Sequence, residues 1–148
     1  DMRSVVHKAC GQIQNAGSVE LFRSHRPDFK DGEQQRDFLY VKDAVAMTLH
    51  LATLPAAAGI FNIGSGKAST WIELVTPIFH ALDLPVNIKF IDMPEILRGK
   101  YQYHTCADVS RLNDTGWSEP THSLEQAVTD YVKNYLIPDH RLGYIEGI

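Results

Sequence analysis

Apolar residues recur first at helical and then at strand spacing in the opening part of the chain. A helix is predicted over residues 2–15 because Val5, Ala9 and Ile13 lie on one helical face, and Gly17 is placed to end it as a left-handed C-cap. A short strand is expected at 19–22. The polar segment 23–35 then predicts a long loop, and long ordered loops inside compact domains tend to be functional.

The central part of the chain predicts a strand, a mostly apolar helix and a second strand. Residues 38–41 have strand character, and Asp43 is placed to cap a helix over 44–51. That helix has little polar face, so we expect it to be buried on most sides. Residues 59–63 then predict a buried strand, and Gly64-Ser-Gly66 a turn out of it.

Capping boxes mark two further helices. Thr70 with Glu73 opens a helix with a core-facing stripe, in which Pro77 predicts a kink or break. Ser123 with Gln126 opens the last helix.

The elements between these two helices are short. We expect a strand at 86–91, one helical turn at 94–97 and a short helix at 109–113 capped by Asp108. Strands alternating with helices predict an α/β fold in a single domain, 1–148.

Composition excludes several classes of partner. The 148 residues are 44% hydrophobic and 22% charged, which suits one globular domain, and the net charge of -4 gives no support for binding nucleic acid. No apolar run approaches the roughly 20 residues needed to cross a membrane. Cys10 and Cys106 have no CxxC partner, as in a reduced, cytoplasmic protein. No HxxxH or HExxH pair occurs, so no metal site is expected.

The glycine-rich stretch 64–69 has the placement of a phosphate loop but not its residues. A Walker loop needs glycine at Phe61 and Ser or Thr at Ala68, and a dinucleotide fingerprint needs glycine at Ser69. A tight turn is the preferred interpretation, so we expect no cofactor-binding residues in this chain. Without a GxSxG elbow or other nucleophile motif, we also name no catalytic residue.

Cationic residues around the long loop predict an anion site. Arginine binds phosphate through two parallel hydrogen bonds, and a tyrosine hydroxyl adds a donor, which suits a diphosphate. Any one of these cations could equally be a solvated surface charge. The functional interpretation is stronger for Arg36, which stands between a loop and an apolar strand. The set comprises Arg23, Arg26, Lys30, Arg36 and the cluster at 98–103.

Several segments resemble nucleotide-sugar epimerases of the extended short-chain dehydrogenase/reductase type, the NAD-dependent epimerase/dehydratase family. The run from Arg36 to Asp43 is similar to the family's RDFxYVxD signature, and Gly59-Ile-Phe-Asn-Ile-Gly-Ser-Gly66 to a second shared element. Leu21-Phe-Arg-Ser24 and Gly99-Lys-Tyr-Gln102 favour the branch that acts on an ADP-heptose in lipopolysaccharide core synthesis. The resemblance extends to about Leu136, and the tail 137–148 has no counterpart in it.

The resemblance implies a set of substrate-binding residues. Arg36 stands where the family binds the substrate diphosphate, and Tyr101 where it has a substrate-binding tyrosine. Lys8, next to His7, stands where the family often has a substrate-contacting histidine. The family's substrate loop corresponds to Phe22, Arg23, Ser24 and His25.

The resemblance also implies an activity for the parent enzyme. That enzyme would invert C6 of ADP-glycero-manno-heptose through a hydride cycle on NADP. The signature at residue 36 leads us to expect only the C-terminal, substrate-binding part, lacking the N-terminal Rossmann half and its Tyr-x-x-x-Lys pair. The chain alone is then expected to be inactive and not to hold NADP tightly.

The segment 36–54 would normally complete the cofactor domain. Its apolar helix therefore lacks its usual partner, and we expect a homo-oligomer or an altered packing. Two alternatives stay open. One is a non-enzymatic α/β module that binds a nucleotide sugar or another protein, and the other is a piece of a different nucleotide-sugar epimerase or dehydratase.

Overall fold

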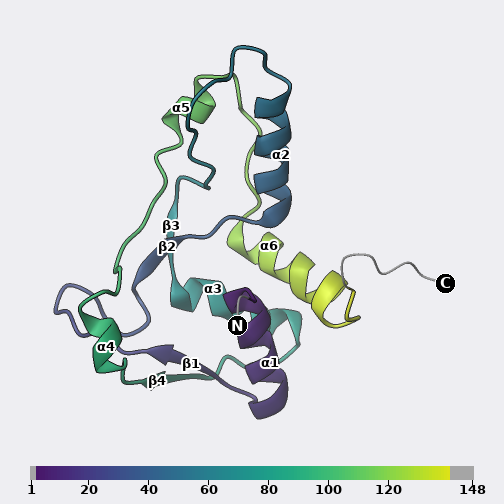
Figure 1. Ribbon diagram of the computed structural model, residues 1–148. Coiled ribbons are helices and arrows are strands. Elements are labelled where there is room, and N and C mark those ends of the chain that lie inside the picture. Colours follow the sequence, from purple (N-terminus) through teal and green to yellow (C-terminus); the bar gives the residue numbers. More distant parts are fainter. Residues whose placement is uncertain (1–2, 141–148) are drawn as a thin grey trace.

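Two small sheets organise the chain in the computed structural model, which describes residues 3–140 (Figure 1). Strands β1 (Val19–Phe22) and β4 (Ile88–Ile91) pair in parallel, with Val19 opposite Ile88. Strands β2 (Gln35–Asp37) and β3 (Ala68–Thr70) pair antiparallel, with Arg36 opposite Ser69. Residues 141–148 of the tail lie outside the described part.

Helices surround these sheets and confirm the predicted α/β class. Gly17 ends the first helix in the left-handed conformation at φ 63°, and both predicted capping boxes are formed. The short helix expected at 109–113 begins instead at Ser110 with Val109 as its N-cap, so Asp108 is not the capping residue, although its carboxylate accepts the Ser110 N–H at 3.0 Å. The helices are α1 (Val5–Ala16), α2 (Val41–Ala52), α3 (Trp71–Ala81), α4 (Glu95–Arg98), α5 (Ser110–Asn113) and α6 (Leu124–Tyr131), which continues as the π-helix η1 (Val132–Leu136).

The hydrophobic core lies where α1, β1, α3, α6 and η1 meet. Val75, Ile78 and Phe79 on α3 have no solvent-accessible surface, and Ile13 of α1 is 1% exposed. Burying each side chain of this size stabilises the fold by about 1.5–3 kcal/mol. The core therefore holds β1, the strand that ends at Phe22, in a defined position against α1 and α3.

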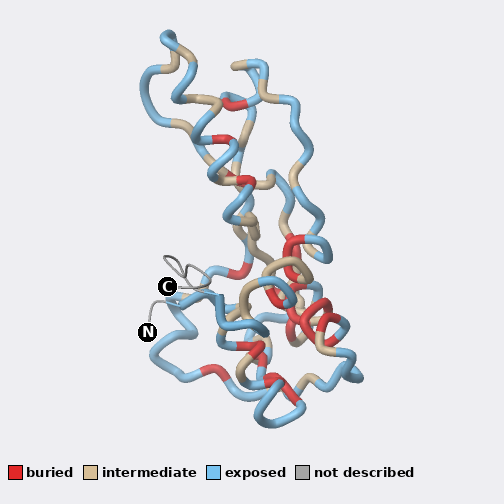
Figure 2. The backbone as a smooth tube through the Cα atoms, turned by 90° about the vertical axis from the view of Figure 1, so that its right-hand side faces the viewer, coloured by how far each residue is buried: buried red, intermediate tan, exposed pale blue. Residues whose placement is uncertain are grey.

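Helix α2 belongs to an arm that extends away from this core (Figures 1 and 2). The expectation that it is buried on most sides is wrong. Only Asp43 and Met47 of α2 are buried, whereas Val41, Val45 and Leu49 are 64%, 51% and 61% exposed. The reason is that α2 packs through a single face on the described part of the chain.

Two predicted strands differ from the structure. The strand expected at 38–41 lies instead at 35–37, because its pairing with β3 uses those residues, and α2 begins at Val41. Asp43 is therefore inside the first turn of α2 rather than at its cap, and its carboxylate accepts the backbone N–H of His122 at 2.9 Å.

Residues 59–63 are not a strand. No strand of residues 3–140 pairs with this segment. A side chain holds its start instead, since Arg111 donates hydrogen bonds to the carbonyls of Ala58 (2.7 Å) and Ile60 (2.8 Å).

Helix α3 continues through Pro77 to Ala81, so the break expected there does not occur. No helix within residues 3–140 is both long and apolar enough to cross a membrane.

Candidate functional site

Aromatic rings and one arginine converge where β1, β2 and the segment 98–103 meet. Phe22 at the end of β1 packs edge-on against Tyr101, with ring centroids 6.4 Å apart. The Arg36 guanidinium carbon lies 5.1 Å from the centroid of Tyr101 and 5.9 Å from that of Trp71. The structure therefore brings together three predicted substrate-binding residues, Phe22, Arg36 and Tyr101, and adds Trp71.

Arg36 is held by its surroundings but keeps most of its hydrogen-bonding capacity. Its Nη1 donates to the Gln35 carbonyl at 2.7 Å, and no carboxylate of residues 3–140 forms an ion pair with it. Burial raises the pKa of Tyr101, and the positive charge of Arg36 opposes that rise. Tyr101 therefore stays protonated near neutral pH and can donate a hydrogen bond.

The arginines of the long loop are engaged in ion pairs with nearby carboxylates. Arg23 pairs with Asp31 (3.5 Å) and Asp92 (3.7 Å). Arg26 pairs with Asp28, and its guanidinium carbon lies 5.0 Å from the centroid of Tyr103. These ion pairs neutralise the two loop arginines. Arg36, by contrast, has no carboxylate of residues 3–140 that would compete with an anionic ligand.

Ser24 and His25 order the loop through their backbone. The Ser24 N–H donates to Asp31 at 2.8 Å, and its hydroxyl donates to the Arg26 carbonyl at 2.9 Å. The His25 N–H donates to the Tyr103 hydroxyl at 3.0 Å. Tyr103, which is 5% exposed, thus ties the loop to the segment that carries Tyr101.

Tyr101 forms a wall of two cavities of different character. One, of about 310 Å³, is mostly apolar and is lined by Val5, Glu20, Leu21, Phe22, Trp71 and Tyr101. The other, of about 640 Å³, is cationic and is lined by His25, Arg26, Arg98, Gly99, Tyr101 and Tyr103. Such a pair of cavities suits a ligand with one apolar or planar end and one anionic part.

Arg98, like Trp71, is a residue of this site that matching to the family did not select. Its Nε donates to the Met93 carbonyl at 2.9 Å, and within residues 3–140 no carboxylate pairs with it. The signal for it was the basic cluster at 98–103. Lys8, by contrast, is exposed on α1 and lines neither cavity.

The glycine-rich turn does not fit a cofactor phosphate. Asp37 accepts the backbone N–H groups of Ser65 (2.8 Å), Gly66 (3.0 Å) and Ala107 (2.9 Å). Burial raises the pKa of Asp37, but these bonds and the Ser65 hydroxyl outweigh it, so the pKa lies below its ordinary value. Because a carboxylate uses the donors that a phosphate loop would offer, the turn is structural, in agreement with the preferred interpretation.

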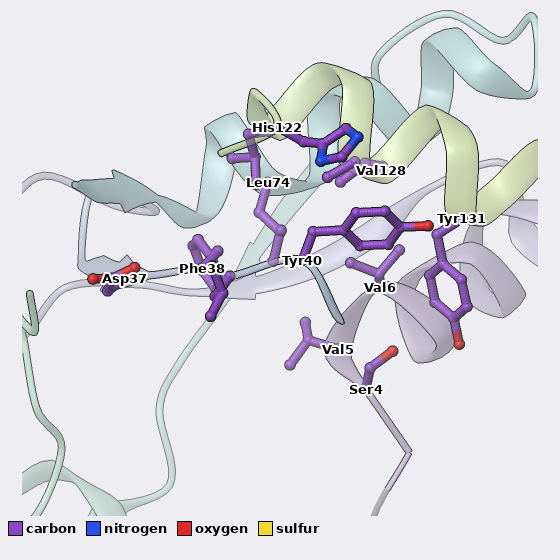
Figure 3. A pocket seen from close by; sticks show the side chains of 13 residues that line it. Ser4, Val5, Val6, Asp37, Phe38, Tyr40, Leu74, His122, Val128 and Tyr131 are labelled. Atoms are coloured by element: carbon purple, nitrogen blue, oxygen red, sulfur yellow. The ribbon is translucent and has the colours of Figure 1, made fainter. Parts of the chain in front are cut away.

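A third cavity, of about 260 Å³, lies between α1 and α6, and Tyr40 and His122 are among the residues that line it (Figure 3). Both residues also make polar contacts that fasten α2 to the core. The Tyr40 hydroxyl donates to Asp130, to which Lys42 also donates at 2.7 Å. Burial and the Asp130 carboxylate raise the pKa of Tyr40 to about 12. His122 contacts Asp43 through Nδ1 at 2.6 Å. These contacts join the arm to the core.

Within residues 3–140 no group of three His, Cys, Asp or Glu side chains could hold a metal ion.

Comparison with known proteins points to one group of enzymes. Residues 1–64 match the NAD dependent epimerase/dehydratase family. The ADP-L-glycero-D-manno-heptose-6-epimerase of Nitratidesulfovibrio vulgaris strain DP4 is 51% identical over 136 residues, covering 92% of this chain and 42% of the relative. That of Fusobacterium nucleatum is 43% identical over 141 residues, covering 91% and 42%.

Solved structures agree in fold. A UDP-N-acetylglucosamine 4-epimerase from Methanobrevibacter ruminantium superposes with a TM-score of 0.75 at 24% identity, covering 94% of this chain and 41% of that one. The ADP-L-glycero-D-manno-heptose-6-epimerase of Helicobacter pylori gives 0.67 at 24% identity, covering 90% and 37%. The chain thus spans 42% of the length of the relatives that match it in sequence.

Proposed function

Since the chain is homologous to part of the ADP-L-glycero-D-manno-heptose-6-epimerases and belongs to the NAD-dependent epimerase/dehydratase family, we propose that it is the part of such an enzyme that binds the nucleotide-sugar substrate. The substrate is an ADP-heptose. In the parent enzyme, NADP supplies the hydride chemistry that inverts C6 of the heptose. This chain supplies the residues that hold and orient the substrate.

The observation that carries this proposal is the position of Arg36 beside Tyr101, with no competing carboxylate in the described part of the chain. A guanidinium with several unused N–H groups and a protonated phenol together offer the donors that a diphosphate accepts. Arg98, in the neighbouring cationic cavity, adds a second guanidinium that forms no ion pair with a carboxylate of residues 3–140. We therefore propose that the diphosphate binds around Tyr101.

The remaining substrate-binding residues have smaller roles in this proposal. The Phe22 ring lines the apolar cavity and contacts an apolar or planar part of the ligand. Ser24 and His25 shape the loop through their backbone bonds. Arg23 must leave Asp31 before it can contact a phosphate, and Lys8 requires a ligand that extends beyond both cavities.

The same proposal assigns no chemical step to this chain. Its glycine-rich turn offers no free phosphate cradle, and we name no catalytic residue. We therefore propose that the chain corresponds to the C-terminal half of the enzyme and that, alone, it neither turns over substrate nor binds NADP tightly. Robust epimerase activity of the isolated chain would overturn this.

Calorimetry on the 148-residue chain tests the proposed substrate. We expect ADP-L-glycero-D-manno-heptose to bind with measurable heat and UDP-glucuronic acid to bind more weakly. Equal binding of both would favour a different nucleotide-sugar epimerase or dehydratase. No binding of either ligand to a folded chain, judged by circular dichroism, would favour the non-enzymatic module.

We also propose that the chain associates with itself through α2. Val41, Val45 and Leu49 recur every four residues and form one exposed apolar stripe on that helix. Such stripes on a helix usually face a partner. A second copy brings an identical stripe, which makes a symmetric pairing of the two helices the simplest arrangement.

A further inference from the structure

The indole N–H of Trp71 is a buried donor without a conventional acceptor. Trp71 is the first residue of α3, and its ring packs edge-on against Phe38, with centroids 5.1 Å apart. Its Nε1 atom is buried and, within residues 3–140, makes no hydrogen bond of normal geometry. Buried donors in native proteins nearly always have a partner, so an unpaired one calls for an explanation.

We assign the Tyr101 hydroxyl as the acceptor for this N–H, because the two side chains share one cavity and one neighbouring arginine. Trp71 and Tyr101 line the same apolar cavity, and the Arg36 guanidinium lies over both rings, 5.9 Å and 5.1 Å from their centroids. The Tyr101 phenol responds to both neighbours: burial raises its pKa, whereas Arg36 and then Trp71 act to lower it. The shared cavity and the common Arg36 neighbour therefore carry the assignment, and the effect of Trp71 on the Tyr101 pKa agrees with it.

We propose that Trp71 is a positioning residue that orients the Tyr101 hydroxyl toward a phosphate oxygen of the ligand. A tyrosine hydroxyl has one proton to donate and lone pairs that accept. When the Trp71 N–H occupies a lone pair, the proton must point elsewhere, and Arg36 draws an anion to that side of the ring. The ligand class is therefore a phosphate-bearing nucleotide, because a phosphate oxygen can only accept.

This inference rests on the proposed function, since it assumes a nucleotide-sugar ligand at Tyr101. It goes further by naming a residue outside the set carried over from the family, and by giving that residue a selectivity role. Removing the indole N–H should weaken ligands that carry phosphate and leave adenosine, which has none, unchanged.

The test is a mutant cycle on the 148-residue chain. Trp71→Phe keeps an aromatic ring but removes the N–H, Tyr101→Phe removes the hydroxyl, and the double variant combines them. Trp117→Phe is the matched control, because Trp117 packs on His50 away from both cavities. Calorimetry measures the affinity for ADP-L-glycero-D-manno-heptose, ADP and adenosine. Ultraviolet difference titration against Tyr101→Phe measures the pKa of Tyr101.

We expect Trp71→Phe to weaken both phosphate-bearing ligands about fivefold and to raise the pKa of Tyr101, as loss of one hydrogen bond predicts. In the Tyr101→Phe background the same change should have no further effect. An equal loss in that background, an equal loss for adenosine, or an unchanged Tyr101 pKa would overturn the inference.

The titration separates this inference from the proposed function. If the wild-type chain binds none of the ligands, the substrate-binding proposal fails. The Trp71–Tyr101 pairing then stands or falls on the pKa of Tyr101 alone. If the wild type binds and Trp71→Phe behaves like it, the proposed function stands and the role of Trp71 is refuted.

Discussion

Asp37 holds Ser65 through two hydrogen bonds to one carboxylate oxygen, from the backbone N–H at 2.8 Å and from the hydroxyl at 2.6 Å. Its other oxygen accepts the N–H groups of Gly66 and Ala107. One side chain on β2 therefore fastens the glycine-rich turn and the segment before α5. This makes Asp37 a structural residue although it lies next to Arg36 of the candidate site.

Removing this carboxylate should destabilise the fold. For Asp37→Ala we expect the free energy of unfolding to fall by about 2–3 kcal/mol, because several backbone donors lose a charged acceptor. Urea unfolding followed by circular dichroism measures the change. Glu119→Ala, at an exposed position, is the control and should change stability by less than about 0.5 kcal/mol. A loss at Asp37 no larger than that of the control would contradict the assignment.

The same contact predicts a pH dependence. The pKa of Asp37 is lower in the folded state than its ordinary value, so its contribution is complete above about pH 4 and is lost as the pH falls further. The difference in unfolding free energy between wild type and Asp37→Asn should therefore shrink between pH 5 and pH 3, values chosen to bracket the ordinary range of a carboxyl group. Urea titrations at both pH values check this. A difference that grows on acidification would mean that the pKa is raised instead.

Local signals in the sequence predicted local structure well. The capping boxes at Thr70 and Ser123 and the left-handed cap at Gly17 formed as expected, because each depends on residues within one turn of helix. The strand expected at 38–41 was wrong, since its apolar residues fit a strand but the pairing with β3 selected 35–37. Strand limits depend on a partner that is distant in sequence.

The candidate site was predictable only in part for the same reason. Family resemblance selected Arg36 and Tyr101, and the structure brings them together. No local pattern could reveal that Trp71 joins them, or that Asp31 and Asp92 neutralise Arg23. These contacts link segments far apart in the chain, and only tertiary packing creates them.

Arg36 itself gives the most direct prediction on binding. Arg36→Ala should weaken ADP-L-glycero-D-manno-heptose by about 10–100-fold, because charge-assisted hydrogen bonds to phosphate are among the strong ones. The affinity of Arg36→Lys should lie between those of the wild type and Arg36→Ala, since lysine keeps the positive charge but not the planar, bidentate guanidinium. Calorimetry measures both. Lys89→Ala, exposed on β4, is the control; equal losses for it and Arg36→Ala would indicate a general electrostatic effect only.

Two glycines with similar backbone geometry give a matched test of packing next to the loop. Gly32 has φ 75°, and a Cβ there would lie 2.8 Å from Ile72 and 2.9 Å from Phe90; Gly17 has φ 63° with nothing within 4 Å. In both alanine variants the left-handed backbone conformation becomes strained, which should lower the free energy of unfolding by about 1–2 kcal/mol. In Gly32→Ala the free energy of unfolding should fall by about 1–3 kcal/mol more, because the added methyl group overpacks against Ile72 and Phe90. Equal thermal stability of the two variants would show that the loop relaxes freely around position 32.

The exposed face of α2 provides the last prediction. If the stripe of Val41, Val45 and Leu49 pairs with a second copy, a charge in its middle should separate the copies, because a carboxylate at an apolar interface must lose its hydration. Sedimentation velocity should show a dimer for the wild-type chain and a monomer for Val45→Asp.

Ile96→Asp is the matched control for this stripe, since Ile96 is an apolar residue, 78% exposed, that lies on α4 and outside the stripe. It should leave the dimer intact, because scattered exposed apolar residues do not by themselves define an interface. A wild-type chain that sediments as a monomer at every concentration would refute self-association through α2. If both variants lose the dimer, the interface includes α4 and the pairing of α2 stripes alone is wrong.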